Sequence, residues 1–127
     1  MITAVHHIAM IVSSEKCLEF YKLLGFTENF RQEREHDIVV LMDGYGVQLE
    51  VFVDERHLKR GILEPLGLRH FALKVTEPLE TEIQRLKDAS SDGLDIGQIM
   101  FDWVGQRFVF IHDYDGNVVE LREEDNV

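Results

Sequence analysis

The sequence has very little cysteine, few basic residues and no long apolar run. Cys17 is the only cysteine in 127 residues, so the chain cannot form an intrachain disulfide, which suits a reducing cytosol. No stretch approaches the roughly 20 apolar residues that a membrane span needs, and the N-terminus lacks the basic and apolar regions of a signal peptide. We therefore predict a cytoplasmic protein with no membrane partner.

Basic residues are outnumbered: 13 Lys and Arg stand against 24 Asp and Glu, which gives a formal net charge of −11. Nucleic acids and anionic membranes are bound by basic patches, so this balance argues against both as partners. A length of 127 residues with 45% hydrophobic residues is typical of one globular domain with a sizeable core. We therefore predict a single domain over 1–127.

Two short motifs each occur twice in the chain, in the same order. His-x-Ala-Met/Leu-x-Val begins at His7 and again at His70, and Asp-x-x-Gly-x-x-x-Glu ends at Glu50 and again at Glu120. The alternative interpretation is coincidence between ordinary strands. Because two separate motifs recur in matching order, the sequence favours a module that has been duplicated.

Apolar alternation and helical spacing predict the same order of elements in each half: a strand, a helix and three strands. The predicted strands cover 5–12, 26–35, 36–42 and 47–53, then 68–75, 97–103, 106–112 and 117–122. The predicted helices run near 14–24 and from about Thr76 to 89, with Ser13 or Ser14 capping the first, Thr76 the second, and Gly25 ending the first. The fold class is therefore α+β, with two tandem βαβββ modules over 1–56 and 66–127 and a connecting loop over 57–65.

The repeat distinguishes between two adjacent histidines. His6 and His7 point to opposite faces of a strand, because side chains alternate along it. His7 matches His70 in the second copy, whereas His6 matches Arg69. We therefore predict that His7 faces the site and that His6 faces solvent or packs at an edge.

Two glutamates join His7 and His70 as candidate site residues. Glu50 and Glu120 lie in apolar strands, where a carboxylate is costly unless it is paired or bound to a metal, although either could be an ordinary exposed residue. Two imidazoles and two carboxylates suit one divalent ion, namely Ni, Zn, Co, Mn or Fe, which would act as a Lewis acid beside a carboxylate base. The predicted metal ligands are His7, Glu50, His70 and Glu120.

Other aromatic, basic, histidine and cysteine residues are candidates either for the site or for the core and surface. An aromatic set in the second module is predicted to pack in the core rather than to line the site: Phe101, Trp103, Phe108 and Phe110. Arg107 either reaches an anionic substrate group or lies on the surface, and Lys59 and Arg60 are candidates for positive charge near the site. Residues predicted to be structural, packed or exposed are Cys17, His36, His57 and His112.

Nearly the whole chain resembles the vicinal oxygen chelate superfamily, also called the glyoxalase/bleomycin-resistance/dioxygenase family, and within it small bacterial proteins of glyoxalase I type. The matching segments are Val5-His6-His7-Ile8-Ala9, Glu19-Phe20-Tyr21-x-x-Leu24-Gly25-Phe26, Leu49-Glu50, Leu68-Arg69-His70-Phe71-Ala72 and Asp113-Tyr114-Asp115-Gly116-Asn117-x-x-Glu120. The resemblance implies a cupped mixed sheet around one divalent metal ion, with His7, Glu50, His70 and Glu120 as its ligands.

The resemblance also implies a reaction. It is a glyoxalase-type lyase or isomerase reaction on a small oxygen-chelating substrate, such as the thiol adduct of a 2-oxoaldehyde. Glu120, in the position of the family's base, would remove a carbon-bound proton, with Glu50 as the second catalytic carboxylate, and the metal would stabilise the enediolate. A homodimer is expected, because exposed sheet edges favour symmetric pairing.

Two positions depart from the pattern of glyoxalase I. Ile11 stands where an Arg typically binds a glutathione carboxylate, and Asp54 stands where an Asn is typical. Losing a cation and gaining an anion should weaken the binding of an acidic tripeptide, so glutathione dependence is not predicted. The alternatives on the same scaffold are a metal-dependent dioxygenase and a metal-free protein that binds or sequesters a small molecule.

Overall fold

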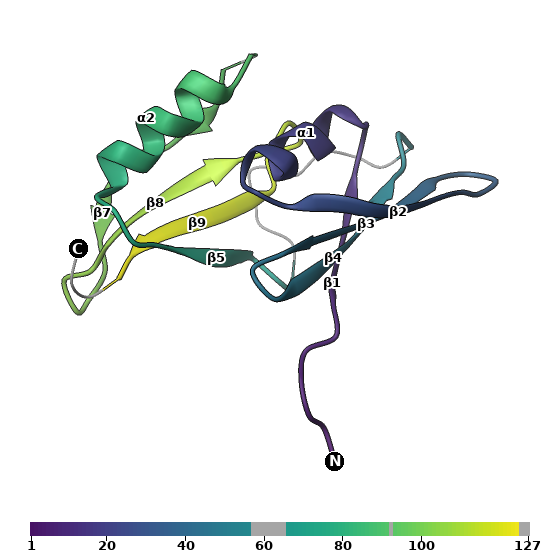
Figure 1. Cartoon of the computed structure of the whole chain (residues 1–127), viewed down its shortest axis with the longest axis horizontal. Helices are drawn as coiled ribbons and strands as arrows, with labels where there is room; N and C mark the ends of the chain where they lie inside the picture. Colours follow the sequence, from purple (N-terminus) through teal and green to yellow (C-terminus); the bar gives the residue numbers. More distant parts are fainter. Residues whose placement is uncertain (57–65, 92, 125–127) are drawn as a thin grey trace. The chain divides into compact units, whose positions relative to one another are not determined.

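The computed structural model describes residues 1–56, 66–91 and 93–124, and the chain divides into two compact units, Met1–Lys59 and Arg60–Val127 (Figure 1). The predicted connecting loop over 57–65 lies outside the described residues. No described helix is long and apolar enough to cross a membrane.

The first unit is a four-stranded mixed sheet with one helix. Its elements are β1 (Ile8–Val12), α1 (Lys16–Leu23), β2 (Thr27–Glu33), β3 (Ile38–Gly44) and β4 (Val47–Val53). The strand order is β1-β4-β3-β2, in which β1 runs parallel to β4 and the other neighbours are antiparallel. Alternate residues of the two central strands are fully buried: Val40, Met42, Leu49 and Val51.

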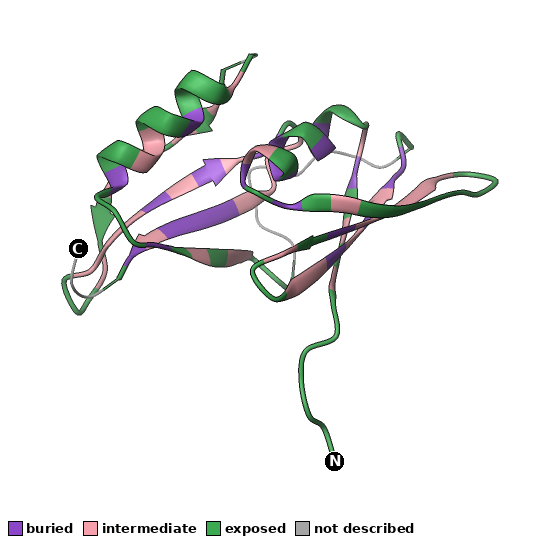
Figure 2. Ribbon diagram, viewed as in Figure 1, coloured by how far each residue is buried: buried purple, intermediate pink, exposed green. Residues whose placement is uncertain are grey.

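The second unit repeats this plan. Its elements are β5 (His70–Val75), α2 (Leu79–Ala89), β6 (Asp95–Ile96), β7 (Met100–Phe101), β8 (Arg107–His112) and β9 (Val118–Glu123). The order is β5-β9-β8-β6, with β7 also paired to β8 and with β5 parallel to β9. The apolar residues buried along β8, β9 and α2 are Val109, Ile111, Val119, Leu121, Leu79 and Leu86, and buried segments are seen on all three elements (Figure 2). The predicted α+β class with two βαβββ modules is confirmed.

Helix α1 begins at Lys16, two residues after the predicted start near 14. Its N-cap is Glu15, whose side chain makes no capping hydrogen bond, so neither Ser13 nor Ser14 is the cap. Ser14 instead forms a turn just before the helix, because its hydroxyl oxygen accepts a hydrogen bond from the backbone N–H of Lys16 at 3.2 Å. The predicted end is confirmed: Gly25 follows the helix with φ of 109°, a conformation that glycine adopts without steric cost.

Helix α2 is capped by a residue distant in sequence rather than by Thr76. Its N-cap position is Pro78, which has no side-chain donor or acceptor. The first helical N–H, that of Leu79, donates a 2.8 Å hydrogen bond to the carboxylate of Glu123 on β9. A buried carboxylate at a helix N-terminus satisfies an otherwise unpaired N–H and opposes the helix dipole. This contact joins α2 to the sheet that it covers.

The strand predicted over 97–103 is shorter than expected: only β7 lies within this range, and β6 precedes it. β6 and β7 both pair with β8, through the pairs Ile96–Ile111 and Met100–Phe108. The two pairs are four residues apart on the β6–β7 side and three residues apart on β8. One extra residue therefore interrupts the ladder, as in a β-bulge. β2 of the first unit contains a register shift as well, so both units bend the strand that follows their helix.

The two aspartates of the repeated motif are not structurally equivalent. Asp43 is an exposed residue of β3 that pairs with Gln48, because β3 and β4 are joined by a two-residue loop. Asp113 lies in the longer β8–β9 loop and is only 5% exposed. Its carboxylate accepts hydrogen bonds from the backbone N–H groups of Asp115 and Asn117 and from the Asn117 side chain, each at 2.9 Å. The motif thus builds two different turns.

Candidate metal centre

The first unit brings one predicted His–Glu pair together. His7 directly precedes β1, and Glu50 lies on β4 opposite Ala9. His7 Nε2 is 3.9 Å from a carboxylate oxygen of Glu50, and the two side chains are 38% and 28% exposed. The other ring nitrogen of His7, Nδ1, lies 2.9 Å from Nδ1 of His6, which is itself exposed.

The second unit builds the same pair in the same register. His70 is the first residue of β5, and Glu120 lies on β9 opposite Ala72. His70 Nε2 is 3.3 Å from Glu120 Oε1, and the side chains are 23% and 11% exposed. The His70 ring also packs edge-on against Phe110, with 5.2 Å between ring centroids. In both units the Glu therefore stands opposite the alanine two residues after the His.

The chemistry of these pairs fits a divalent metal. Two ligand atoms that are each about 2.1 Å from one ion lie roughly 3.0–3.4 Å apart for octahedral to tetrahedral angles. The His70–Glu120 spacing of 3.3 Å falls in this range, and the His7–Glu50 spacing of 3.9 Å is wider. No three His, Cys, Asp or Glu side chains gather closely enough to hold a metal in the part of the chain that the structure describes. That all four residues bind one ion stays a prediction.

Glu120 is held from its other side by an arginine that sequence reasoning missed. Arg122 Nη1 lies 3.3 Å from Glu120 Oε2, and Arg122 Nη2 lies 2.5 Å from a carboxylate oxygen of Asp102. The hydrogen bond from Arg122 lowers the pKa of Asp102. Asp102 also accepts hydrogen bonds from the backbone N–H groups of Val104 and Gln106, each at 2.9 Å. The spacing Glu-x-Arg on one strand was the signal for this contact, since residues two apart share a face.

The corresponding position in the first unit is apolar. Phe52 follows Glu50 by two residues, as Arg122 follows Glu120. The guanidinium of Arg34 lies 5.4 Å from the centre of the Phe52 ring, within the range of a cation–π contact. Arg34 also donates to Asp37 at 2.6 and 2.7 Å, and this hydrogen bonding raises the pKa of Arg34. Within the described residues, no arginine contacts Glu50 directly as Arg122 contacts Glu120.

The anion expected at Asp54 is neutralised within its own unit. Asp54 is 3% exposed, and its carboxylate accepts hydrogen bonds from the backbone and guanidinium of Arg56 at 2.7–3.0 Å. The ion pair with Arg56 offsets the charge of this carboxylate, and weaker binding of an acidic tripeptide stays a prediction. Ile11 is 48% exposed on β1, so the first module presents an apolar side chain at this position.

The prediction that the aromatic set packs in the core is wrong for two of its members. Trp103 is 97% exposed and Phe101 is 69% exposed, because β7 is a two-residue strand at the sheet edge and Trp103 lies in the turn beyond it. Phe108 and Phe110 are half-buried on β8, with 5.4 Å between their ring centroids.

The remaining candidates lie away from the His–Glu pairs or outside the described residues. Arg107 forms ion pairs with Glu80 on α2 and, at 3.7 Å, with Glu123, so it joins helix and sheet. His36 is exposed beside Glu35, and His112 lies 3.7 Å from Asp95. Cys17 is fully buried, as predicted. His57, Lys59 and Arg60 lie outside the described residues.

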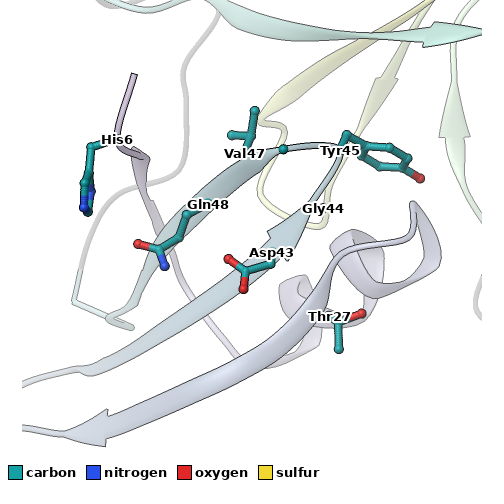
Figure 3. Close-up of a pocket in the computed structure, with 8 residues that line it drawn as sticks. His6, Thr27, Asp43, Gly44, Tyr45, Val47 and Gln48 are labelled. Carbon is teal, nitrogen blue, oxygen red and sulfur yellow. The ribbon is translucent and has the colours of Figure 1, made fainter. Parts of the chain in front are cut away.

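A hollow of about 520 Å³ lies at the end of the β3–β4 hairpin (Figure 3). It is lined by His6, Thr27, Asp43, Gly44, Tyr45, Gly46, Val47 and Gln48. The Tyr45 hydroxyl donates to the Leu24 carbonyl, which fixes this edge of the hairpin. None of the predicted metal ligands lines the hollow, although His6, which does line it, lies beside His7.

The fold described above also occurs in solved structures of other proteins. No protein-family model matches the sequence, and no curated protein matches it either. Among solved structures, the glyoxalase family protein from Enterococcus faecalis is 29% identical with a TM-score of 0.83, over 94% of this chain and 97% of that chain. The protein SMU.1112c is 31% identical with a TM-score of 0.83, over 97% and 100% of the two chains.

A more distant structure has the same fold. It is a mutant of the fosfomycin resistance protein FosX from Listeria monocytogenes, complexed with Mn(II) and a dihydroxypropylphosphonic acid. It is 17% identical with a TM-score of 0.74, over 99% of this chain and 96% of that chain. Two βαβββ modules in matching register, together with these likenesses over nearly the full length, lead to one conclusion. The chain belongs to the vicinal oxygen chelate superfamily of glyoxalase/bleomycin-resistance/dioxygenase proteins.

Proposed function

We propose that the protein is a metal-dependent lyase or isomerase of glyoxalase type. Its substrate is a small molecule with adjacent oxygen atoms, such as the thiol adduct of a 2-oxoaldehyde. The observation that carries this proposal is the duplicated pair, in which a histidine Nε2 faces a glutamate oxygen at the same register of two parallel strand pairs. A protein that only binds an apolar ligand gains nothing from repeating a His–Glu pair.

The proposed site holds one divalent ion, Ni, Zn, Co, Mn or Fe, and the proposed domain is a single one over 1–127. Its ligands are His7, Glu50, His70 and Glu120. When bound, the ion supplies Lewis-acid stabilisation of negative charge on the substrate oxygens, worth several kcal/mol. The likeness to a glyoxalase family protein, and to a FosX variant that binds Mn(II), supports the choice of a divalent metal.

The protein's own residues then move and direct a proton. Glu120 accepts the proton from a substrate carbon and returns it to the neighbouring carbon, with Glu50 as the second carboxylate that can do so. Arg122 holds Glu120 Oε2 at 3.3 Å, which leaves Oε1 directed toward His70. Phe110 packs on the His70 ring and fixes its plane. The side chain of Glu120 is 11% exposed, so little water competes for its oxygens.

We also propose that the protein acts as a homodimer. β1 and β5 each stand at one end of their sheet's strand order, and an edge strand offers backbone groups for symmetric pairing. Light scattering after size-exclusion chromatography measures the mass directly, and a monomer at micromolar concentration would contradict this part of the proposal.

Metal titration of the purified, chelator-treated protein tests the central proposal. We expect saturable binding of about one ion per His-Glu-His-Glu set, weakened at least about 100-fold by His70→Ala and by His7→Ala, because even residues beyond the ligands change metal affinity by 10–100-fold. His36→Ala is the matched control, since His36 is an exposed histidine beside Glu35. Absence of binding at micromolar metal would overturn the proposal and leave a metal-free binding protein.

A turnover assay separates the two metal-dependent alternatives. The metal-loaded protein is offered methylglyoxal with a panel of thiols that includes glutathione, and product is measured with and without oxygen. Turnover that is independent of oxygen supports the glyoxalase-type reaction. Turnover that stops when oxygen is removed would overturn it in favour of a dioxygenase.

A further inference from the structure

The sheet of the second unit presents two cations on the same face as Glu120. Parallel pairing of β5 with β9 places Ala72 opposite Glu120 and Lys74 opposite Arg122. Cross-strand partners project from the same side of a sheet, and so do residues two apart on one strand. Glu123 belongs to the other face, where it caps the first turn of α2. Lys74, Arg122 and Glu120 therefore share the sheet face that α2 does not cover.

Like charges directly opposite each other on neighbouring strands are unfavourable. Arg122 offsets part of this repulsion through its contacts with Asp102 and Glu120. The side chain of Lys74 is exposed and makes no hydrogen bond or ion pair with any residue in the described ranges. An oxyanion bound between the two side chains would remove the repulsion and give Lys74 a partner.

This pair of cations is particular to the second module. The matching positions of the first module hold Ile11 and Phe52, which also face each other across a parallel strand pair. Duplication alone therefore does not account for Lys74 and Arg122. The chain carries 13 basic against 24 acidic residues, so two cations face to face are not the result of a generally basic surface either.

The spacing suits one small molecule. Residues two apart on a strand are separated by about 6.5 Å, so Lys74 stands one such step from the Ala72–Glu120 row. A lysine side chain spans that distance. If the oxyanion of a substrate binds Lys74, a substrate atom only a few bonds away would therefore reach Glu120.

We propose that Lys74 and Arg122 form an oxyanion subsite beside the His70–Glu120 pair, and that the substrate therefore carries a carboxylate or phosphonate close to its reacting carbon. This inference rests on the proposed function for its meaning, since it names the substrate class of that site. The subsite itself consists only of side chains of the second unit.

Anion binding to chelator-treated protein tests the subsite without the metal. Methylphosphonate and propionate are titrated by calorimetry at low ionic strength, with uncharged dimethyl methylphosphonate as the neutral probe. We expect saturable binding of at least one anion and none of the neutral ester. Lys74→Met should weaken it about tenfold, because a hydrogen bond to a charged group is lost, while Lys74→Arg should restore most of it. Lys87→Met, at an equivalent lysine on α2, is the matched control.

The outcomes are separable from those of the metal titration. Tighter binding of methylphosphonate assigns a phosphonate or phosphate group, and tighter binding of propionate assigns a carboxylate. Equal anion binding by the Lys74→Met variant and the unchanged protein would overturn the subsite, and so would absence of saturable binding. Failure of metal binding alone would overturn the proposed function and leave the anion result standing. Circular dichroism melting confirms that each variant is folded.

Discussion

The two modules carry the same His–Glu pair in different surroundings. In the first module the pair is 3.9 Å apart and its side chains are 38% and 28% exposed, whereas in the second it is 3.3 Å apart and its side chains are 23% and 11% exposed. Two residues beyond the glutamate, the first module has Phe52 and the second has Arg122. The duplication therefore preserved the register of the His–Glu pair while the contacts around it diverged.

Because of this divergence, the side chains of Glu50 and Glu120 differ in how freely they can move. Glu120 is held between His70 and Arg122, so its position is fixed before any ligand arrives. Glu50 lies 3.9 Å from His7, which is farther than Glu120 lies from His70, and apolar Phe52 follows it by two residues. A fixed carboxylate is a better ligand and a better-aimed base, because orientation need not be gained during the reaction. We therefore expect the second module to dominate the chemistry.

The strongest test of this difference removes each carboxylate's ability to accept a proton. Glu120→Gln should lower kcat about 10²–10⁴-fold, the usual contribution of a general base, and Glu50→Gln should lower it less. The measurement is turnover at saturating metal, with metal content determined for each variant, so that lost binding is not mistaken for lost chemistry. A larger loss in Glu50→Gln would reverse the assignment of roles to the modules.

The helices provide a second contrast, in stability rather than chemistry. Helix α2 is capped by the buried carboxylate of Glu123, whereas α1 has no side-chain cap and the position matching Glu123 is Val53. Glu123→Gln should lower the free energy of unfolding by about 1–2 kcal/mol, since it removes a charged acceptor from a helix N-terminus.

Urea unfolding measures this change, with Glu124→Gln as the control because Glu124 is exposed and adjacent. Equal stabilities of the two variants would show that the 2.8 Å contact between Glu123 and the Leu79 N–H contributes nothing. Metal affinity should stay unchanged in both variants, because Glu123 points to the face that α2 covers.

Local sequence patterns predicted the features that neighbouring residues determine, namely secondary structure and strand register. Alternation located most of the strands, and the repeat matched His70 with Glu120 because strand register is set by side-chain period. Contacts between residues far apart in sequence gave no local signal. The cap of α2 by Glu123 is one such contact, and the hold of Asp102 on Arg122 is another. The exposure of Trp103 was missed because composition does not show which strand ends at an edge.

The repeated Asp-x-x-Gly motif supplies a further contrast, because its two aspartates match in sequence and differ in structure. Asp113 is buried and accepts three hydrogen bonds within its loop, so Asp113→Ala should cost about 1–3 kcal/mol of unfolding free energy. Asp43 is exposed on β3 with Asn29 as its partner, so Asp43→Ala should change stability by less than about 0.5 kcal/mol. Urea unfolding of both variants measures the difference. Equal losses would mean that the two turns are energetically equivalent, and that the duplication extends beyond the His–Glu pairs into the loops.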